Sequence, residues 1–489
     1  MKNLIKFIFG YVLVVFFINF FYTEYYGNFF FLLLTFSGLI FNLLVIFKTD
    51  VLSKKYKFLS AGFIGVFTAF IVFNGGIVTL MYVKNLNYIE ANRFIDFLNY
   101  NMLMKFTTAA ALGNISLWLG YYSKIGDYLF SFYYIGLGYK NFLNLEINVN
   151  FPKTLIFFGL LFNAILFSYG GFGRGTATPE DYTGFVKYLL IYSSYIQKIS
   201  VIGYFLLALI YFKTGLHKRW FWVSLSLLVF FALISGARGP IIFLFILTVL
   251  PYYYVKRKVT KGILLIGFVT VLIAFTIASE IKSFTQKVDT TQVSLADYKD
   301  EFIQFREASG EEFDKKIYST LYYSIILRLN TVAPGSIAIK YKDNHGLDKS
   351  DPNFVKEFFM VPVYTFIPRS KVLNSVFPSW GNWFRIKVLG FSDSYFSNTT
   401  FGSVAFFYFL GDWLFVVIGF FFYGVSLKFG NNVLELGTGL SFLLYLTIIS
   451  SLGYITASVP AAIVSFLRYI VFLPLFFYVV IGFFNRLRL

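Results

Sequence analysis

Apolar runs long enough to form membrane-spanning helices alternate with polar segments along most of the chain. A spanning helix needs about 20 mostly apolar residues. Runs of this kind lie at 4–22, 28–47, 58–82, 102–122, 154–170, 186–212, 220–236, 240–254, 262–279, 402–427, 438–458 and 463–484. The pattern predicts about 12 transmembrane helices, and the short run at 240–254 and the long run at 186–212 allow one more or one fewer.

The composition agrees with this pattern. Of the 489 residues, 58% are hydrophobic, 22% aromatic and 13% charged, whereas a soluble protein has about a quarter of its residues charged. A water-soluble core could not bury so many apolar side chains, which excludes a soluble enzyme, a disordered tail and a fibrous protein. The absence of cysteine also excludes disulfides and thiolate metal sites. We predict an all-α polytopic membrane protein.

Basic residues concentrate in alternate loops. The 42 Lys and Arg against 24 Asp and Glu give a formal charge of +18, which in a soluble chain would suggest nucleic acid. Here most of the excess lies around 48–57, 124–153, 213–219 and 256–261 and at the C-terminal end. The positive-inside rule makes these loops cytoplasmic. We therefore expect no nucleic-acid partner, both termini in the cytoplasm, and a first run that is retained as an anchor because no cleavage site follows it.

A long polar stretch at 280–400 divides the chain into three regions. Residues 1–279 carry predicted helices 1–9, and residues 401–489 carry predicted helices 10–12. The stretch between them begins acidic, has apolar residues at helical spacing over 315–341, and ends with aromatic, proline and basic residues. Loops of this length inside a compact protein are usually functional. We expect a large external loop that contains short amphipathic helices.

The sharpest local motif is Ser-Gly-Ala-Arg-Gly-Pro at 235–240, between two apolar runs. Its glycines permit a tight turn, and Pro240 suits the first turn of the next helix. The turn is external by the topology above and places Arg238 at the membrane surface or below it, where a charge is costly unless it meets an anion. A guanidinium binds phosphate through paired hydrogen bonds and keeps its charge. We predict an anion site at Arg238, with a structural cap or a lipid-headgroup contact as the alternatives.

Two further external segments carry cations. At 169–176, a glycine-rich backbone surrounds Arg174, which fits an anion-binding nest and a flexible loop equally well. At 366–387, aromatic rings and two prolines accompany the cations, a combination suited to stacking sugars and holding a pyrophosphate. The alternative is an interfacial aromatic belt with snorkelling cations. This second segment contains Arg369, Lys371, Trp380, Trp383 and Arg385.

Candidate acids and bases are fewer. His345 and Asp343 could deprotonate a sugar hydroxyl, although the residues around them are more typical of a solvated turn. Asp343, Asp348 and Asp351 could form a weak Mg²⁺ or Ca²⁺ site. The chain has only two histidines, and one of them, His217, is predicted to be cytoplasmic, which excludes a His-rich metal site.

Four charged residues fall inside predicted spans, where facing lipid would be costly. Asp412 and Arg468 lie towards the external ends of their helices, so we expect them to face a cavity. The sequence does not show whether these two residues pair. The four are Lys105, Lys198, Asp412 and Arg468.

With these residues in view, the chain resembles the bacterial oligosaccharide repeat-unit polymerases, the Wzy-type O-antigen or capsule polymerases. The architecture is similar over nearly the whole length. The motifs that carry the resemblance are Ser-Gly-Ala-Arg-Gly at 235–239, Ile-Pro-Arg-Ser at 367–370, Phe-Gly at 401–402 and Tyr-Phe-Leu-Gly-Asp-Trp at 408–413. In the family a W-P-x-K-P-like stretch usually follows the second motif. Here Val-Phe-Pro-Ser-Trp at 376–380 stands in that region without the expected lysine-proline pair, which leaves the roles of Lys371 and of 377–380 open.

The resemblance implies a GT-C-like glycosyltransferase of the bacterial inner membrane, with the large loop on the periplasmic side. Its substrates would be undecaprenyl-pyrophosphate-linked oligosaccharides in contact with membrane lipid, and a chain-length regulator is a further candidate partner. The non-reducing-end hydroxyl of a new unit would attack the anomeric carbon of the growing chain, and undecaprenyl pyrophosphate would leave. Fixed arginines can stabilise that pyrophosphate without a metal or another cofactor.

The same resemblance suggests a role for each candidate residue. The pyrophosphates would be held by cations, the sugar path lined by aromatic rings, and the acceptor hydroxyl deprotonated by His345 or by an acidic loop residue. The pyrophosphate ligands would be Arg238 and Arg369, with Arg174; Arg328 and Arg385 would support them; Trp380, Trp383 and Tyr364 would line the path; and Lys371 and Asp412 would be further substrate contacts.

Other functions remain as alternatives. An O-antigen ligase shares the architecture and the arginine chemistry but uses lipid A–core as the acceptor. A lipid-linked oligosaccharide flippase should not need a long aromatic external loop. A secondary transporter should show inverted repeats with broken helices in matching halves, and the sequence shows neither these nor the motifs of the shape-and-division peptidoglycan polymerases. A scaffold would leave the external arginines unexplained.

Overall fold

The chain is described by a computed structural model. The described residues are 2–49, 51–52, 56, 59–74, 100–137, 139–143, 147–168, 184–234, 238–257, 265, 303–304, 332–346, 355–356, 358–360, 383–390, 402–453 and 458–486. Regular secondary structure in these ranges is helical, without strands. The chain divides into unit 1, Met1–Asn144 with Ser324–Tyr478, and unit 2, Leu145–Tyr323 with Val479–Leu489.

The helices follow the predicted apolar runs closely. Every run contains a helix except 262–279, which lies almost wholly outside the described residues. The helices on either side of the motif at 235–240 begin and end as predicted. Helix α11 (Lys218–Ile234) ends just before the motif, and Pro240 lies in the first turn of α12 (Arg238–Lys256). Hydrophobic runs of this length therefore identify the helices well, with ends that mostly differ by a few residues, although α19 continues past 427 to Glu435.

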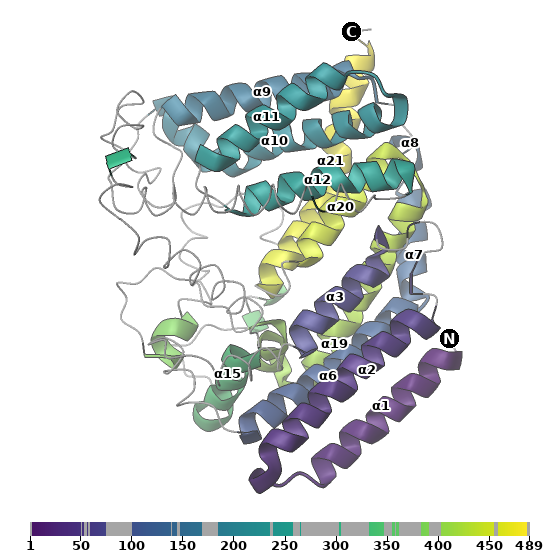
Figure 1. Ribbon diagram of the computed structural model, residues 1–489, viewed down its shortest axis with the longest axis vertical. Helices are drawn as coiled ribbons and strands as arrows, with labels where there is room; N and C mark the ends of the chain where they lie inside the picture. The colour runs from purple at the N-terminus through teal and green to yellow at the C-terminus, as the bar shows by residue number, and fades with distance from the viewer. Residues whose placement is uncertain are drawn as a thin grey trace. The chain divides into compact units, whose positions relative to one another are not determined.

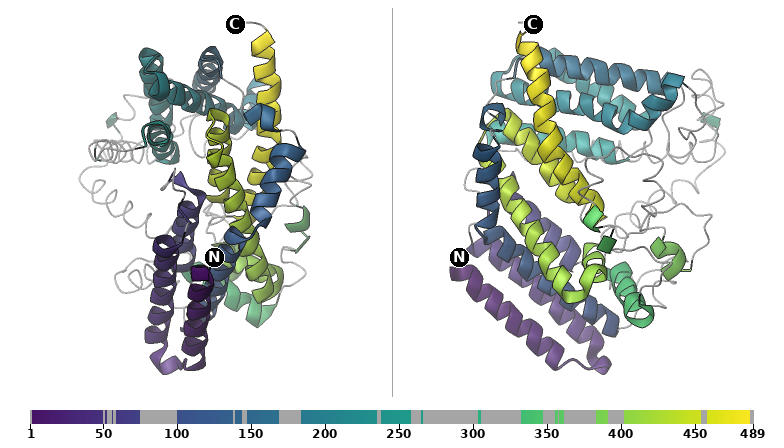
Figure 2. Two further views of the ribbon diagram at one scale, coloured as in Figure 1. Left: turned by 90° about the vertical axis from the view of Figure 1, so that its right-hand side faces the viewer. Right: turned by 180° about the vertical axis from the view of Figure 1, so that it is seen from behind.

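Unit 1 is built from helices of the N-terminal and C-terminal parts of the chain (Figures 1 and 2). Short π-helical turns, Phe132–Gly136 and Phe384–Val388, accompany them. The helices are α1 (Lys2–Phe20), α2 (Gly27–Lys48), α3 (Ala61–Asn74), α6 (Tyr100–Tyr122), α7 (Ile125–Ser131), α8 (Tyr139–Leu143), α15 (Val332–His345), α19 (Gly402–Glu435), α20 (Gly439–Gly453) and α21 (Val459–Arg486), the last of which runs on into unit 2.

The central helix pair of unit 1 is α6 with α19, which lie side by side along much of their length (Figure 1). Glycines allow this close approach. A Cβ on Gly120 of α6 would collide with the Phe421 carbonyl, and a Cβ on Gly424 of α19 would collide with the Leu117 carbonyl. Small residues let membrane helices approach closely enough for dispersion contacts to hold them together. The two glycines thus fix how α6 and α19 pack.

Polar bonds inside the apolar core of unit 1 add to this packing. The fully buried indole of Trp118 in α6 donates to Asn42 Oδ1 in α2 over 3.0 Å. The Tyr423 hydroxyl of α19 donates to Thr68 Oγ1 in α3 over 3.1 Å. Because these groups are buried, each bond satisfies a donor that would otherwise be costly to desolvate.

Helix α19 is broken, although the sequence predicted an uninterrupted span over 402–427. Gly411 has φ 174° and ψ 51°, and Asp412 has φ 54° and ψ −145°, so neither residue is helical. A positive φ is uncommon for any residue except glycine. An irregular backbone at membrane depth is tolerated where it is buried in protein or lines a cavity. The break therefore separates two helical segments of α19, one before Gly411 and one after Asp412.

Unit 2, taken by itself, contains in its described part α9 (Asn150–Ser168), α10 (Gly184–Thr214), α11, α12 and the last residues of α21. Helix α10 packs most extensively on α9 and also contacts α11 and α12 (Figure 1). The Tyr204 hydroxyl of α10 lies 2.7 Å from Thr248 Oγ1 of α12.

Four helical stretches in the described residues are long and apolar enough to cross a membrane: Asn3–Phe20, Glu24–Lys48, Gly402–Glu435 and Val459–Phe476. Large apolar side chains are also exposed on outer helix faces; Phe9 and Phe20 of α1, for example, are 64% and 70% exposed. Contiguous exposure of this kind is unusual in water and normal against lipid tails. The chain therefore has the character of a helical, membrane-embedded protein.

Candidate functional site

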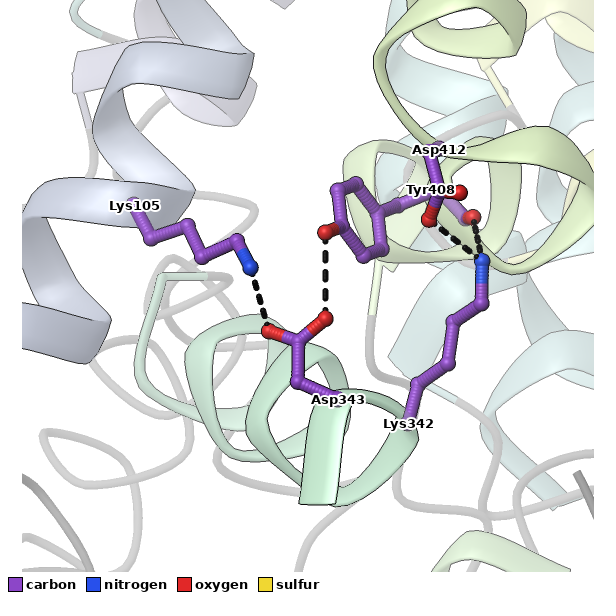
Figure 3. Close-up of polar contacts among 5 residues, drawn as sticks. All are labelled: Lys105, Lys342, Asp343, Tyr408 and Asp412. Carbon is purple, nitrogen blue, oxygen red and sulfur yellow. Dashed lines mark hydrogen bonds and ion pairs between the residues drawn. The ribbon is translucent and has the colours of Figure 1, made fainter. Parts of the chain in front are cut away.

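Five polar side chains from three separate helices meet near the break in α19 (Figure 3). Lys105 comes from α6, Lys342 and Asp343 from the last turns of α15, and Tyr408 and Asp412 from α19 on the two sides of Gly411. We call these five residues the junction cluster. It joins a helix of the predicted external loop to two predicted membrane helices, all within unit 1.

Asp343 is held from two directions. Lys105 Nζ lies 2.6 Å from Asp343 Oδ2, and the Tyr408 hydroxyl donates to Asp343 Oδ1 over 3.1 Å. The side chains of Lys105 and Asp343 are 37% and 31% exposed, so the carboxylate is partly accessible. An ionised carboxylate has about four lone-pair positions, and these two donors leave acceptor positions on both oxygens for a further hydroxyl.

Lys342 binds to the break itself. Its Nζ donates to Asp412 Oδ1 and to the Tyr408 carbonyl, each over 2.7 Å. Carbonyls in the last turn of a helical segment need partners from outside the helix, and a cation is favourable there because of the helix dipole. Lys342 therefore stabilises the backbone just before the break and the carboxylate just after it.

The Tyr408 ring lies between the two lysines. Lys105 Nζ is 5.5 Å and Lys342 Nζ is 4.8 Å from the ring centroid. Both distances suit cation–π attraction, which is worth about 0.5–1 kcal/mol at accessible sites. Trp413 packs edge-on against the same ring, with centroids 5.7 Å apart. These contacts fix the position of the Tyr408 hydroxyl relative to Asp343.

The charges of the junction cluster balance, because each ammonium group has one carboxylate partner. Partly exposed ion pairs usually contribute about 0.2–1 kcal/mol, so these pairs fix geometry more than they stabilise the fold. A balanced cluster also attracts an anion weakly. Its free acceptor positions suit a neutral polyol such as a sugar better than a pyrophosphate.

A row of aromatic rings continues from the same end of α15. His345 stacks on Tyr341 with centroids 4.8 Å apart, Tyr341 meets Trp383 edge-on at 5.9 Å, and Trp383 meets Phe409 edge-on at 5.7 Å. Trp383 is buried, whereas His345 is exposed. His345 Nδ1 lies 3.2 Å from the Tyr341 carbonyl, which it can bond when Nδ1 carries the proton. We call these four residues the aromatic row.

Metal ligands do not gather in the described part of the chain: it holds no group of three or more His, Cys, Asp or Glu side chains placed to bind a metal ion. Asp343 and Asp412 are instead each paired with a lysine. Asp348 and Asp351, the other two residues of the weak cation site considered from the sequence, lie outside the described residues.

No family model, curated protein or solved structure matches the chain. The function of the junction cluster therefore rests on its own chemistry and on the sequence motifs.

The described part of the chain brings three of the predicted site residues together. Asp412 binds Lys342, His345 stacks on Tyr341, and Trp383 packs on that same Tyr341, so all three are connected through the last turns of α15. Residues 343–346 are exposed, as predicted for a solvated turn, but the predicted turn is helical: α15 continues to His345, and Gly346 follows with φ 66°.

The side chains of the other predicted site residues are not among those that the structure describes. Arg238 begins α12 and Arg385 lies in the turn Phe384–Val388, but the structure does not describe their side chains. The remaining six lie outside the described residues: Arg174, Arg328, Tyr364, Arg369, Lys371 and Trp380. Their roles stay predictions.

Sequence reasoning did not select Lys342, and it noted Lys105 only as a charge inside a span and Tyr408 only as part of the motif at 408–413. The useful signal was the rule that a charge at membrane depth has a partner. Applied to Lys105 and Asp412, it indicates partners without naming them, because those partners lie 238 and 70 residues away in the chain.

Proposed function

We propose that the chain is a membrane glycosyltransferase that polymerises undecaprenyl-pyrophosphate-linked oligosaccharide repeat units on the external face of the bacterial inner membrane. The observation that carries the proposal is the convergence of His345, Trp383 and Asp412, chosen from the sequence, on one end of α15. The resemblance to Wzy-type polymerases in the motifs at 235–239, 367–370 and 408–413 supports the same function.

The chemistry of such a transfer matches what the cluster and the aromatic row offer. An acceptor hydroxyl must be oriented and deprotonated, and sugar rings must be held, which carboxylates and aromatic side chains can do. The leaving pyrophosphate needs cations, which we assign to Arg238 and Arg369 from the sequence, with Arg174 as a further candidate. His345 or an acidic residue of the loop would accept the acceptor proton.

The polar contacts of unit 1 join residues that are predicted to lie on the same side of the membrane. Residues predicted to lie on the external side bond to each other: Lys105 pairs with Asp343 and the Tyr22 hydroxyl donates to Asn101. Contacts between residues predicted to be cytoplasmic include Lys428 with Asp127 and the Tyr122 hydroxyl with Thr49 Oγ1. The pairings thus agree with the predicted grouping of these residues by side, and the external assignment of the junction cluster comes from the distribution of lysine and arginine.

Alanine substitutions of the two principal arginines test the proposal in cells. Arg238→Ala and Arg369→Ala, each expressed at the wild-type level, should abolish long polymer and leave glycolipid that carries a single repeat unit. Arg219→Ala is a matched control, because Arg219 is exposed at the start of α11 and is predicted to be cytoplasmic. Normal polymer length in both of the first two variants would overturn the arginine assignment.

A further inference from the structure

We infer that Asp343, rather than His345, is the group that takes the proton from the acceptor-sugar hydroxyl. This inference rests on the proposed glycosyltransferase function and names a residue within it. Its first support is placement: Asp343 lies between Lys105 of α6 and Tyr408 of α19, where the predicted external loop meets two predicted membrane helices (Figure 3).

Asp343 and His345 point to different surroundings. Two residues apart on a helix, they project about 200° apart around its axis, so one substrate hydroxyl cannot approach both in the same way. The ring of His345 stacks on the ring of Tyr341, and the described contacts of His345 are all with its own helix. Asp343 is bonded to side chains of two other helices.

A general base must be held rigidly relative to the bound substrate. The carboxylate of Asp343 meets this requirement, because Lys105 fixes Oδ2 and Tyr408 fixes Oδ1. His345, in contrast, is the last residue of α15, is followed by Gly346, and has its described contacts only with Tyr341 of the same helix. The rigid carboxylate is the better placed of the two bases.

The position of Asp343 also argues for a functional role. An acidic residue in the last turn of a helix is electrostatically unfavourable, because the carbonyl end of the helix dipole is negative. Lys105 offsets this cost from another helix. An uncharged residue at this position would end α15 without that electrostatic cost, whereas a proton acceptor needs the carboxylate.

In the reaction, the acceptor oxygen forms a bond to the anomeric carbon of the growing chain as its proton moves to Asp343. The bond between that carbon and the diphosphate oxygen breaks, and its electron pair leaves with the lipid diphosphate. The proton then passes from Asp343 to water. Lys105 and Tyr408 do not react; they are positioning residues that hold the carboxylate.

Substitution at Asp343 tests the inference with the full-length purified protein and a lipid-diphosphate-linked repeat unit. Asp343→Asn keeps the shape of the side chain but cannot accept the proton, so the polymerisation rate should fall roughly 10²-fold or more. Binding of the lipid-linked substrate should stay within about three-fold of wild type, because the amide retains hydrogen bonding. Asp343→Glu should recover part of the rate.

Two controls make the result specific. Asp127→Asn removes a carboxylate that also pairs with a lysine of unit 1, Lys428, near the other end of α19, and should leave the rate unchanged. His345→Gln should cost less than Asp343→Asn. A near-normal rate for Asp343→Asn, or a larger loss for His345→Gln, would overturn the assignment.

The positioning residues give an independent readout. Tyr408→Phe removes one of the two bonds to the carboxylate, so kcat should fall by about ten-fold with little change in KM. Lys105→Arg should retain more activity than Lys105→Gln. If Asp343→Asn does not fold, the Tyr408 and Lys105 variants test the inference in its place. An unchanged kcat for Tyr408→Phe would then contradict it. Absence of polymer from the wild-type protein would overturn the proposed function itself, whereas an active Asp343→Asn would overturn only the base.

Discussion

Lys342 donates two hydrogen bonds from one ammonium group to the two sides of a broken helix. One goes to the Tyr408 carbonyl before the break and the other to the Asp412 carboxylate after it. The lysine side chain is 17% exposed, whereas that of Asp412 is 59% exposed. Water can replace the lysine at Asp412 more easily than at the carbonyl, so the bond to Tyr408 should contribute most of the stabilisation.

Replacing this lysine should destabilise the protein measurably. Lys342→Met leaves the Tyr408 carbonyl without that donor, and we expect a loss of about 1–3 kcal/mol in the free energy of unfolding. Lys342→Arg should retain most of the stability because it keeps the charge and the donors. Thermal unfolding in detergent measures the effect, with Lys340→Met on the same helix as the control. Equal melting temperatures for the two methionine variants would contradict this role.

At the scale of single residues, the sequence predicted which charges need partners but not which partners they find. Lys105 and Asp412 stand out because they interrupt apolar runs. Their partners, Asp343 and Lys342, are neighbours in a polar stretch; the sequence marks Asp343 as a candidate base but does not link it to Lys105, and it does not mark Lys342. Only the approach of α15 to α6 and α19 gives these two residues their role.

At the scale of helices, the lengths of the hydrophobic runs predicted the positions of the helices well, but they did not predict where a helix is irregular. The runs that predict α2 and α6 end within about two residues of the observed helices. The hydrophobic pattern did not predict the break at Gly411 and Asp412, because the residues on both sides of it are equally apolar. The pattern also did not predict the last turns of α15, because the residues there are polar and typical of turns, yet they continue the helix.

The packing of α6 on α19 depends on two glycines and can be tested at the level of these helices. Gly120→Ala and Gly424→Ala each place a methyl group against the backbone of the other helix. Each should therefore reduce the free energy of unfolding by about 1–3 kcal/mol. Thermal unfolding of the purified variants in detergent would show this loss.

Gly10 of α1 provides the matched control, because a Cβ there would meet no atom within 4 Å. Gly10→Ala should leave the stability unchanged or raise it slightly, since alanine favours helix over glycine. If Gly120→Ala and Gly424→Ala melted like Gly10→Ala, the close approach of α6 and α19 would not hold in solution.

For the whole molecule, composition alone was enough to predict a helical membrane protein, because 58% hydrophobic and 13% charged residues cannot form a soluble surface and core. The distribution of lysine and arginine then gave a topology. Function could be predicted only through motifs, and most of the arginines in those motifs lie outside the described residues or have side chains that are not described.

The topology can be tested directly because the chain has no cysteine of its own. A membrane-impermeant maleimide added to intact spheroplasts should label Glu24→Cys and Asn344→Cys, whose side chains are exposed and predicted to be external. Lys124→Cys, exposed and predicted to be cytoplasmic, should react only after the membrane is permeabilised. Labelling of Lys124→Cys in intact spheroplasts, with no labelling of the other two, would reverse the predicted orientation.

The most direct measurement of the central claim is the product that the purified protein makes from a single lipid-diphosphate-linked repeat unit. A polymerase uses that molecule as both donor and acceptor, so the products should form a ladder that differs by one repeat unit per step and releases one lipid diphosphate per bond. No metal ion should be needed, because arginines are proposed to stabilise the leaving group. A ladder in the presence of a chelator is the predicted result. No product from the repeat unit alone, together with a single transfer when lipid A–core is supplied, would contradict the account and identify a ligase.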